Sequence, residues 1–371
     1  MKRILHVVGR MDRGGTESML MSMFRTMDRT ELMFDFVEQT QDVCDFDEEI
    51  TALGGKIYRC PHISATNIIE YRKWWRTFLK EHPEYLIVHG HSRGSAPIYI
   101  QEANRAGRIT VLHCHNNSHG RGLAGLRRYL WQLQLRHMAD YCFACSTEAG
   151  VSQFGKRGNF TVIHNGIQTD KFRFNGETRK RVRSELGIKD DEYIIGNVAR
   201  FETQKNHELL IKVFERVKAA EPAAKLMLVG HGTLEEAIRR QVKESGLTDS
   251  VMFMGLRSDV CDLLQAMDVF LLTSWFEGLG IAGVEAQAAG LPCVVSSTVS
   301  REMKLTDNMK YVDINADAGA WAEAVLEYKN RMGERRDTSG EIRRAGYDIA
   351  YTTKQLCDFY NEVLTKKNVQ I

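Results

Sequence analysis

Long apolar runs are missing from this sequence of 371 residues. No run approaches the roughly 18 to 20 apolar residues that a membrane-spanning helix needs, which argues against an integral membrane protein of the helical kind. The first residues, MKRILHVVGR, form a short apolar stretch and then a polar glycine turn, and they lack the form of a secretory signal peptide. We therefore expect a cytoplasmic protein.

An excess of one charge is also missing. The formal net charge is only +2, so no overall field points to a nucleic-acid partner. Cysteines are few, and most lie inside apolar, strand-like runs, which favours reduced and buried thiols. Cys142 and Cys145 have the spacing of a redox motif, but they lie within a strand pattern rather than at a helix start, so we expect both to be structural.

Two series of alternating strands and helices fill the sequence, and its 43% apolar residues are enough for two cores. This alternation predicts an α/β fold of two doubly wound, Rossmann-like domains. A turn-rich segment at 164–172 marks the boundary, giving domains 1–164 and 165–350 and a final helix within 351–371. The clearest early helix is 17–27. The predicted strands are 3–8, 33–37, 56–59, 85–89, 110–113, 141–144, 160–164, 194–198, 225–229, 251–254, 269–273 and 292–295.

Two carboxylates, Glu277 and Glu285, stand eight positions apart in a segment that changes from loop to short helix. If most of the spacer is helical, they lie roughly 12 Å apart along the axis. The free amides at the helix start, at Gly278, Leu279 and Gly280, suit a phosphate. Hydroxyls at both ends and anionic charge between them describe a nucleotide sugar. The plainer interpretation is two ordinary acids on a helix surface.

The context favours a site. Apolar strands at 269–274 and 292–297 flank the segment, which places Glu277 at the carboxyl end of a strand, where open parallel sheets bind ligands. The segment resembles the Glu, seven residues, Glu signature of retaining GT-B glycosyltransferases. It is most similar to the bacterial family 4 enzymes that build exopolysaccharide, capsule and O-antigen. That resemblance implies two Rossmann-like domains facing a central cleft, with the final helix returning to the first domain.

Several other motifs carry the same resemblance. They are the Gly14-Gly15-x-Glu17 opening, the His113-x-His115-Asn116 strand end, the Asn165-Gly166 linker, the Arg200-x4-Lys205 segment, Gly230-x-Gly232, and the Gly255 to Asp259 stretch. From the Asn165-Gly166 linker to the Glu277 to Glu285 segment, the order of these motifs covers the whole second domain. Gly280 is a departure, because many relatives have proline there; this leaves the donor-sugar preference open and predicts a more mobile loop.

Roles for individual residues follow from the resemblance. Glu285 would bind the ribose hydroxyls, and Glu277 would bind donor-sugar hydroxyls and position the anomeric carbon. Arg200 and Lys205 would stabilise the departing diphosphate, where cations act most strongly as charge builds up. His115 would close the sugar pocket together with Gly14 and Gly15. The remaining donor-binding residues are Gly230, Gly232, Leu256, Gly278, Leu279, Gly280 and Ile281.

Metal binding is the tempting interpretation of strand-end histidines at 89, 91, 113 and 115. We do not expect a metal site, since a lone strand-end histidine is more often a hydrogen-bonded structural residue and no helical H-x-x-x-H and no pair of C-x-x-C motifs is present. Asp45 and Asp47 have the D-x-D form that metal-dependent transferases use, but they lie in an acidic run on an expected helix. The GT-B resemblance implies that no metal or other cofactor is required.

Basic residues concentrate between Arg72 and Arg136. This segment contains eleven Lys or Arg and three acids, which gives a local charge of +8. Aromatics alternate with basic residues at 71–76 and 127–131, on expected helices. The plainer interpretation is a solvated helical face with core tryptophans. The functional one is a surface for anionic lipid headgroups, each basic residue contributing around 1 kcal/mol. Such a surface would hold the enzyme peripherally on the cytoplasmic face of a membrane.

The hypothesis is a retaining glycosyltransferase whose donor is a nucleoside-diphosphate sugar, with uridine diphosphate expected from family frequency. The expected acceptor is a lipid-linked sugar or a growing polysaccharide. Two alternatives stay open. One is another GT-B enzyme, such as a sugar phosphorylase or a nucleotide-sugar epimerase, and the other is a non-catalytic nucleotide-sugar-binding subunit.

Overall fold

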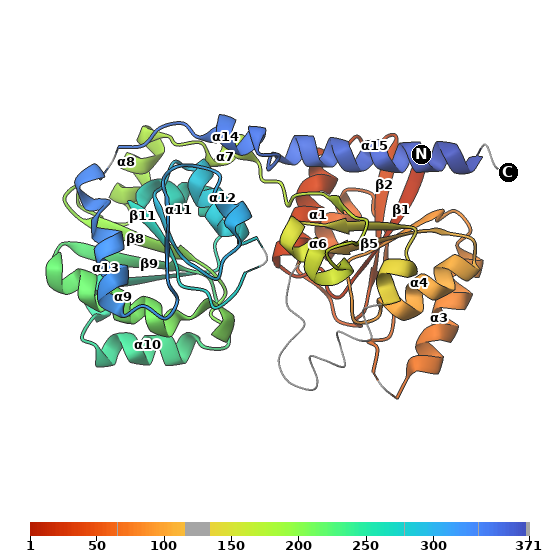
Figure 1. Ribbon diagram of the computed structural model, residues 1–371, viewed down its shortest axis with the longest axis horizontal. Coiled ribbons are helices and arrows are strands. Elements are labelled where there is room, and N and C mark those ends of the chain that lie inside the picture. The colour runs from red at the N-terminus through yellow and green to blue at the C-terminus, as the bar shows by residue number, and fades with distance from the viewer. Residues whose placement is uncertain (65, 116–133, 278, 333, 369–371) are drawn as a thin grey trace. The chain divides into compact units, whose positions relative to one another are not determined.

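The structure is a computed structural model that describes residues 1–368 except 65, 116–133, 278 and 333. The chain divides into two compact units, shown in Figure 1. The first unit is Met1–Ile167 together with Asp348–Ile371, and the second is Gln168–Tyr347. The domain ends expected from the sequence, at 164 and 350, fall three residues away from these.

The first unit is built on a seven-stranded sheet in the order β3-β2-β1-β4-β5-β6-β7, and every paired strand is parallel. All seven strands predicted for this half are confirmed: β1 Lys2–Val8, β2 Leu32–Glu38, β3 Ile57–Arg59, β4 Ile87–Gly90, β5 Ile109–Cys114, β6 Tyr141–Ala144 and β7 Thr161–Val162. Its helices are α1 Gly15–Thr26, α2 Asp47–Ala52, α3 Ile68–Glu81, α4 Ala96–Arg105, η1 Gln134–His137, α6 Thr147–Phe154 and α15 Ile349–Asn368.

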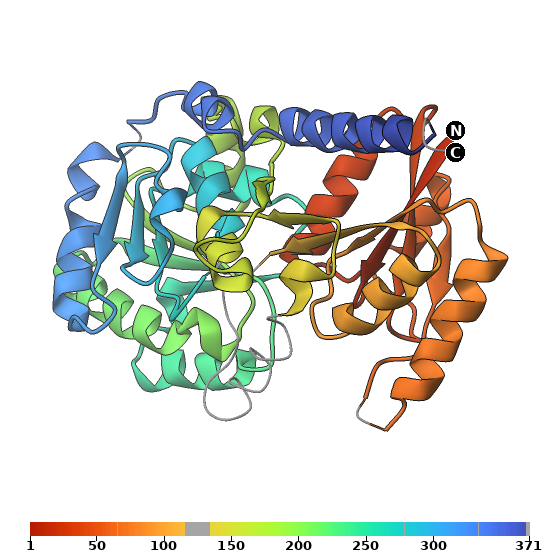
Figure 2. The ribbon, with the colours of Figure 1, turned by 45° about the vertical axis from the view of Figure 1, so that its right-hand side comes forward.

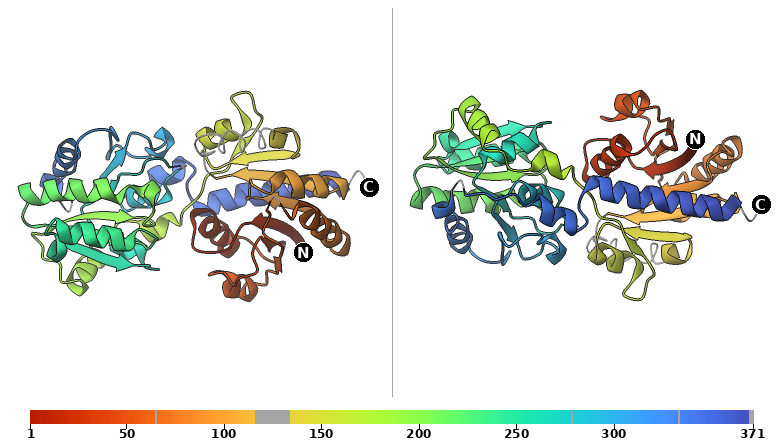
Figure 3. Two further views of the ribbon diagram at one scale, coloured as in Figure 1. Left: turned by 90° about the horizontal axis from the view of Figure 1, so that it is seen from below. Right: turned by 90° about the horizontal axis from the view of Figure 1, so that it is seen from above.

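Helices cover both faces of this sheet. Leu20 and Phe24 lie on the apolar face of α1, and they share one buried core with Phe34 of β2 and with Leu356 and Tyr360 of α15. In the right-hand view of Figure 3, α15 lies lengthwise across the first unit. Figure 2 shows α3 and α4, in orange, which pack together on a second core. Burial of both faces explains the almost continuously apolar strands.

The first crossover to the second unit needs a glycine at Gly166. A Cβ there would lie 2.8 Å from the Cα of Ile349 and 2.5 Å from the hydroxyl of Thr352. Next to it, Ile167 and Asp348 form an isolated parallel bridge, so the outgoing and returning segments run side by side. The Asn-Gly pair of the sequence therefore has a packing reason at this junction.

The second unit contains a six-stranded sheet in the order β10-β9-β8-β11-β12-β13, again with only parallel pairs. Its strands are β8 Tyr193–Val198, β9 Ala224–Val229, β10 Val251–Gly255, β11 Val269–Leu272, β12 Cys293–Ser296 and β13 Met309–Val312. The first five were predicted and are confirmed. The sequence prediction missed β13, a four-residue edge strand whose Lys310 interrupts the apolar pattern.

Helices of the second unit also cover its sheet. The buried residues Leu210 and Phe214 of α9 pack beside Trp321 of α13 in one core, and Figure 1 shows these two helices together. The helical elements are α7 Thr169–Phe172, α8 Gly176–Glu185, η2 Thr203–Lys205, α9 His207–Ala220, α10 Glu235–Glu244, η3 Thr248–Ser250, α11 Val260–Ala266, α12 Ile281–Ala288, η4 Arg301–Met303, α13 Ala318–Leu326, η5 Lys329–Arg331 and α14 Ser339–Arg344.

Both sheets share one winding scheme. The chain leaves the first strand of each sheet to build one side and then returns to build the other. The reversal lies between β1 and β4 in the first unit and between β8 and β11 in the second. In such sheets the crevice outside the carboxyl ends of these strands is where ligands bind. None of the described helices is long and apolar enough to cross a membrane.

Candidate functional site

Lys205 and Glu277 meet at the strand reversal of the second unit. Lys205 ends the short helix after β8, and Glu277 follows β11. The Lys205 ammonium lies 2.5 Å from Glu277 Oε1, and the Ser274 hydroxyl donates to the same oxygen at 2.7 Å. Both charged side chains are largely buried, with 18% and 7% of their surfaces exposed. The structure therefore joins two of the predicted site residues directly.

The two loops that carry this pair are joined by one backbone hydrogen bond and by hydrogen bonds from side chains to backbone carbonyls. The Trp275 amide donates to the Gln204 carbonyl at 2.9 Å, and the Gln204 amide group donates to the Phe276 carbonyl at 2.8 Å. Thr273 Oγ1 donates to the Asn206 carbonyl at 3.0 Å, and Asn206 has a left-handed φ of 53°. None of these supporting residues was predicted as part of the site, because side chain to backbone ties leave no spacing signal in a sequence.

Arg200 lies on the same loop, just beyond β8, and its side chain is exposed. Within the described part of the chain, its guanidinium has no hydrogen-bond or ion-pair partner. Two aromatic side chains are also unusually exposed here, Trp275 at 43% and Phe276 at 41%. The strand ends of the second unit thus combine a neutralised pair, an unpaired cation and apolar ring surfaces.

Helix α12 begins at Ile281 and includes four of the seven residues between Glu277 and Glu285. Glu277 belongs to the preceding loop, and the estimated axial separation does not apply. Gly280 is the N-cap residue and has a φ of 68°. Proline holds φ near −65°, so proline cannot occupy this position in this backbone conformation. Gly278 lies outside the described residues.

Glu285 projects from α12 and is half-buried. Desolvation by burial raises the pKa of its carboxyl to about 7. Among the residues described, no group donates a hydrogen bond to this carboxyl or pairs with it. A carboxylate in that state can gain much from a ligand that brings hydroxyl donors. Leu279 is buried, while Ile281 is half-buried at the helix start.

Gly230 and Gly232 have a packing role as well as the predicted ligand role. A Cβ on Gly230 would lie 2.0 Å from the Ala199 carbonyl oxygen, and one on Gly232 would lie 2.5 Å from that of Phe201. These glycines thus let the loop after β9 lie against the loop that carries Arg200. Leu256, which follows β10, is 66% exposed.

In the first unit, Gly14 and Gly15 lie where β1 leads into α1, as predicted. The Glu17 carboxylate folds back over this helix start, and a Cβ on Gly14 would lie 2.3 Å from Glu17 Oε2. An acidic side chain thus already faces the positive end of the helix.

Five histidines lie together at the carboxyl ends of β1, β4 and β5, although the sequence pattern suggested isolated residues. His6 pairs in register with His89, and residues two apart on a strand share a face. His6 Nδ1 lies 3.0 Å from His91 Nε2, and His91 Nδ1 lies 2.8 Å from His115 Nε2. The cluster comprises His6, His89, His91, His113 and His115. Two repeats of H-x-H on strands that become neighbours were the available signal.

Burial keeps these imidazoles neutral. It lowers the pKa of His6 to about 3 and that of His115 to about 4, and it lowers the pKa of His91 well below its ordinary value. Two groups of three, His6 with His89 and His91, and His91 with His113 and His115, have ligand atoms within 4.8 Å of one another. Neither group contains a carboxylate.

The D-x-D pair is engaged in structural contacts. Asp45 precedes α2 rather than lying on it, which corrects the expected helix position, and its carboxylate accepts from the Arg13 amide at 3.0 Å. Asp47 begins α2 and pairs with Arg59, which also pairs with Glu38. Both carboxylates of the motif are thus already bound by protein groups.

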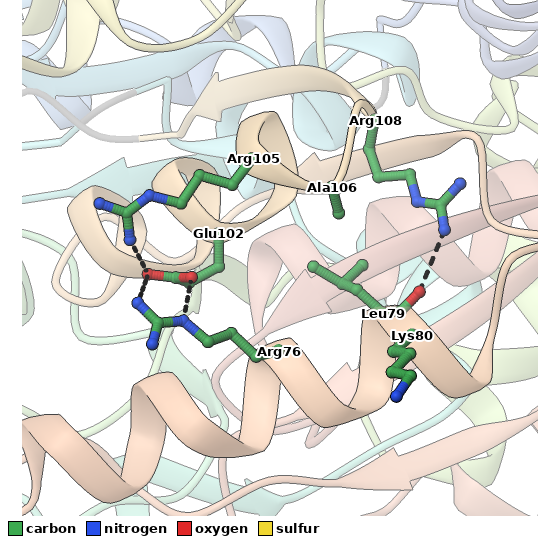
Figure 4. A pocket seen from close by; sticks show the side chains of 7 residues that line it. All are labelled: Arg76, Leu79, Lys80, Glu102, Arg105, Ala106 and Arg108. Atoms are coloured by element: carbon green, nitrogen blue, oxygen red, sulfur yellow. Dashed lines mark hydrogen bonds and ion pairs between the residues drawn. The ribbon is translucent and has the colours of Figure 1, made fainter.

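One buried acid pairs with three of the eleven basic residues of this zone. Glu102 accepts from Arg72, Arg76 and Arg105, and Figure 4 shows the last two converging on it across a shallow pocket. Arg108, at the other end of that pocket, donates to the Leu79 carbonyl at 3.0 Å. The predicted helix at 71–76 is confirmed within α3. The 127–131 stretch lies outside the described residues.

The exposed side of α3 carries both apolar and basic side chains. Ile69 is 86% exposed at the start of the helix, and Lys73 and Lys80 are exposed further along it. Positions separated by four and seven residues share one side of a helix. This side of α3 therefore presents two lysines together with an exposed isoleucine.

All eight cysteines lie in the described part of the structure and are free thiols. Cys142 and Cys145 are buried on β6 and just after it, and burial raises the pKa of the Cys142 thiol to about 11. A thiol with a raised pKa is a poor nucleophile. The structural interpretation of this pair is supported.

Comparison with known proteins bears on the same segments. The family model "Glycosyl transferases group 1" matches residues 178–344, and "Glycosyltransferase Family 4" matches residues 13–171. EpsF of Bacillus subtilis (strain 168), a provisionally assigned glycosyltransferase, is 32% identical over 378 residues, covering 99% of this chain and 98% of EpsF. The chain belongs to the group 1, family 4 glycosyltransferases.

Other relatives of this glycosyltransferase agree. The Escherichia coli UDP-Gal:alpha-D-GlcNAc-diphosphoundecaprenol alpha-1,3-galactosyltransferase is 26% identical over 231 residues, covering 58% of each chain. The Anabaena HepE structure with UDP and glucose superposes with a TM-score of 0.80 at 18% identity, over 98% of this chain and all of that one. The predicted GT-B fold class, with two Rossmann-like domains, is confirmed.

Proposed function

We propose that this glycosyltransferase moves a sugar from a nucleoside-diphosphate sugar, most simply a UDP-sugar, to a lipid-linked or polysaccharide acceptor in cell-surface glycan synthesis, with retention of the anomeric configuration. One observation carries the proposal. At the strand reversal of the second unit, Lys205 and Glu277 form a buried pair 2.5 Å apart, beside the exposed Arg200. Cations and a carboxylate at this place suit an anionic, hydroxyl-rich ligand.

Glu285 is the proposed nucleotide anchor. Its carboxyl has no partner among the described residues, and its raised pKa reflects an ionised form that is poorly solvated. Ribose hydroxyls would supply the missing donors, and hydrogen bonds to a charged group contribute about 1.5–3 kcal/mol each. Leu279, Gly280 and Ile281 would bring the amides of the α12 start to the phosphates, and α12 has no side-chain cap that competes with them.

Glu277, Lys205 and Arg200 would carry the chemistry. The bond between the anomeric carbon and the diphosphate oxygen breaks, and a bond to the acceptor oxygen forms on the same face. The acceptor proton passes to the departing phosphate. Arg200 and Lys205 would stabilise the growing negative charge, an effect worth about 10²–10³ in rate for one well-placed group. Glu277, held by Ser274 and Lys205, would orient the donor sugar.

The donor and acceptor classes draw on relatives. The name of the Escherichia coli relative specifies a UDP-sugar donor and a diphosphoundecaprenol-linked acceptor, and HepE binds UDP. In this chain the first unit would receive the acceptor, with Gly14, Gly15 and His115 near the donor sugar. Gly230, Gly232 and Leu256 would border the nucleotide. No metal or other cofactor is required in this scheme.

Peripheral membrane contact is part of the same proposal. Ile69 with Lys73 and Lys80 would rest on anionic headgroups, which would bring the enzyme to a lipid-linked acceptor from the cytoplasmic side. Arg72, Arg76 and Arg105 pair with Glu102, so the proposed contact relies on two lysines. We therefore expect reversible binding.

A thermal-shift screen against nucleotide sugars tests the proposal. A ligand at 100 times its dissociation constant adds about 2.7 kcal/mol of stability, which raises the melting temperature clearly. The expected result is stabilisation by one group of UDP-sugars, followed by sugar transfer when acceptor is added. Consumption of inorganic phosphate, formation of an epimer without acceptor, or binding without turnover would each replace the proposed activity with another one.

A further inference from the structure

Three members of the histidine cluster, His6, His91 and His115, form a continuous imidazole chain. The two contacts are 3.0 Å between His6 Nδ1 and His91 Nε2, and 2.8 Å between His91 Nδ1 and His115 Nε2. The ring centroids lie 5.2 Å and 5.1 Å apart, with interplanar angles of 21° and 28°. The facing nitrogens of neighbouring rings are close while the ring centroids are far apart. The rings are therefore joined end to end by hydrogen bonds rather than stacked face to face.

A metal ion fits this arrangement less well. Zinc bonds to imidazole nitrogen at about 2.0–2.1 Å, so two nitrogens of a tetrahedral site stand roughly 3.3–3.4 Å apart. The nitrogens of the chain are closer and face each other, as in a hydrogen bond that shares one proton. No carboxylate in either three-histidine group would offset the charge of a buried dication.

Proton counting leaves two arrangements for the chain. Each neutral imidazole has one N–H and one lone pair, so each contact uses one proton. In the first, His6 donates to His91, His91 donates to His115, and His115 carries its own proton on Nδ1. In the second, every bond is reversed, so His115 Nδ1 has a bare lone pair and His6 carries a proton on Nε2.

Asn165 favours the first arrangement. His115 Nδ1 and Asn165 Oδ1 are both buried, and neither atom has a hydrogen-bond partner within the described part of the chain. Burial lowers the pKa of His115, and Asn165 opposes that effect by raising it. An oxygen acceptor beside an N–H has that effect. In the second arrangement the lone pair of His115 would face this oxygen, and a proton on the buried His6 Nε2 would have no acceptor.

We propose that His6 and His91 are positioning residues that hold His115, through the imidazole chain, in the neutral tautomer with its proton on Nδ1. The proposal rests on the proposed function in one respect, the placement of His115 beside the donor sugar. It adds that His115 serves there as a fixed, non-titrating wall of the pocket. With Nε2 bound to His91 and Nδ1 buried toward Asn165, neither nitrogen exchanges a proton with substrate.

The full-length protein labelled with 15N-histidine tests the chain directly by NMR. The expected spectrum shows His115 as the Nδ1–H tautomer in at least about tenfold excess, as one to two net hydrogen bonds would give. Couplings between nitrogens across both contacts and no titration of His115 between pH 6 and pH 8 are also expected. An Nε2–H tautomer, a titration midpoint between 6 and 7, or stoichiometric zinc binding that removes the couplings would overturn the proposal.

Two substitutions at one position separate positioning from space filling. His91→Gln keeps an amide N–H for His115 and a carbonyl for His6, so the tautomer excess should persist. His91→Leu should reduce it to below about threefold, since one hydrogen bond is lost. His62→Gln, at an exposed histidine of the same unit, is the control and should change nothing. Equal spectra for Gln and Leu at position 91 would show that His91 only fills space.

Sugar transfer by His115→Ala, measured separately, keeps the two proposals distinguishable. If the chain is present in the spectrum but His115→Ala transfers sugar normally, the placement of His115 in the donor site fails and the chain stands. If His115 titrates near neutrality but His115→Ala is inactive, the chain fails and the proposed function stands.

Discussion

The two units use the same strand order but place opposite chemistry at the point where it reverses. At the carboxyl ends of β1, β4 and β5 the first unit gathers five histidines, and burial keeps the imidazoles of His6, His91 and His115 neutral. Between β8 and β11 the second unit places the Lys205–Glu277 pair, with Arg200 beside it. Topology thus provides the location, and side chains decide whether it is a neutral or a charged site.

The difference suits the proposed division of labour. A diphosphate needs cations, which the second unit supplies, whereas a sugar ring needs shape and hydrogen bonds without excess charge. Neutral imidazoles offer shape and hydrogen bonds without charge near physiological pH, because burial keeps them from ionising. Substitutions that remove charge from the second unit, or that change the backbone or the surface of either unit, test this difference.

Loss of the Lys205 cation should have the largest effect. Lys205→Met should lower the rate of sugar transfer by about 10²–10³, because the departing diphosphate loses one charged donor. Steady-state kinetics with the donor identified by thermal shift would measure it. Lys212→Met is the matched control, since Lys212 pairs with Glu208 on the exposed face of α9. Equal rates for both variants would mean that the charged strand ends are not catalytic.

Glu285→Gln should weaken nucleotide binding by about 10- to 100-fold, as expected for a hydrogen bond to a charged group. The native carboxyl has a pKa of about 7, so nucleotide affinity should rise from pH 6 to pH 8 as it ionises. The Gln variant should show no such rise. Isothermal titration calorimetry at three pH values measures both, with the exposed Glu244→Gln as control.

The raised pKa of Glu285 also predicts how the stability of the folded protein changes with pH. Because the folded pKa of Glu285 lies above its ordinary value of 4.5, the folded state holds a proton that the unfolded state has lost between pH 4.5 and 7. Its contribution to stability therefore falls across that window and stays unfavourable above it, by on the order of 2 kcal/mol. Glu285→Gln should melt several degrees higher at pH 8 and unchanged at pH 4. Equal increases in melting temperature at pH 8 and at pH 4 would contradict this.

Gly280→Ala should destabilise the second unit by about 1–2 kcal/mol, because the left-handed region costs an L-residue about this much. Its φ is 68°, and a Cβ would also lie 3.0 Å from Met303 Sδ. Thermal denaturation measures the change. Gly176→Ala is the control, since its Cβ would meet nothing within 4 Å. A stable Gly280→Ala protein would show that this loop takes another conformation in solution.

The smallest effect is expected on the surface of the first unit. Lys73→Gln should lower binding to phosphatidylserine vesicles by about fivefold, corresponding to about 1 kcal/mol for one basic residue. Vesicle sedimentation measures it, with neutral vesicles and Lys212→Gln as controls. Unchanged binding would mean that α3 is an ordinary solvated helix, as its pairing with Glu102 already suggests for the arginines.

Local patterns predicted most of the fold. Apolar runs bounded by turn residues located twelve of the thirteen strands that the described residues form, and the periodic apolar residues of 17–27 located α1. The missed strand, β13, is short and contains Lys310, so its pattern carries too little signal.

The alternation of strands and helices, the family motifs and the candidates Glu277, Glu285, Arg200 and Lys205 could all be read from local sequence patterns. Only the tertiary structure decided that Lys205 and Glu277 touch, 72 residues apart, and that His6 meets His91, 85 residues apart. Spacing along a chain reports which face of one element a residue occupies. Which strands become neighbours depends on non-local burial and pairing, and there the two units acquired their different chemistry.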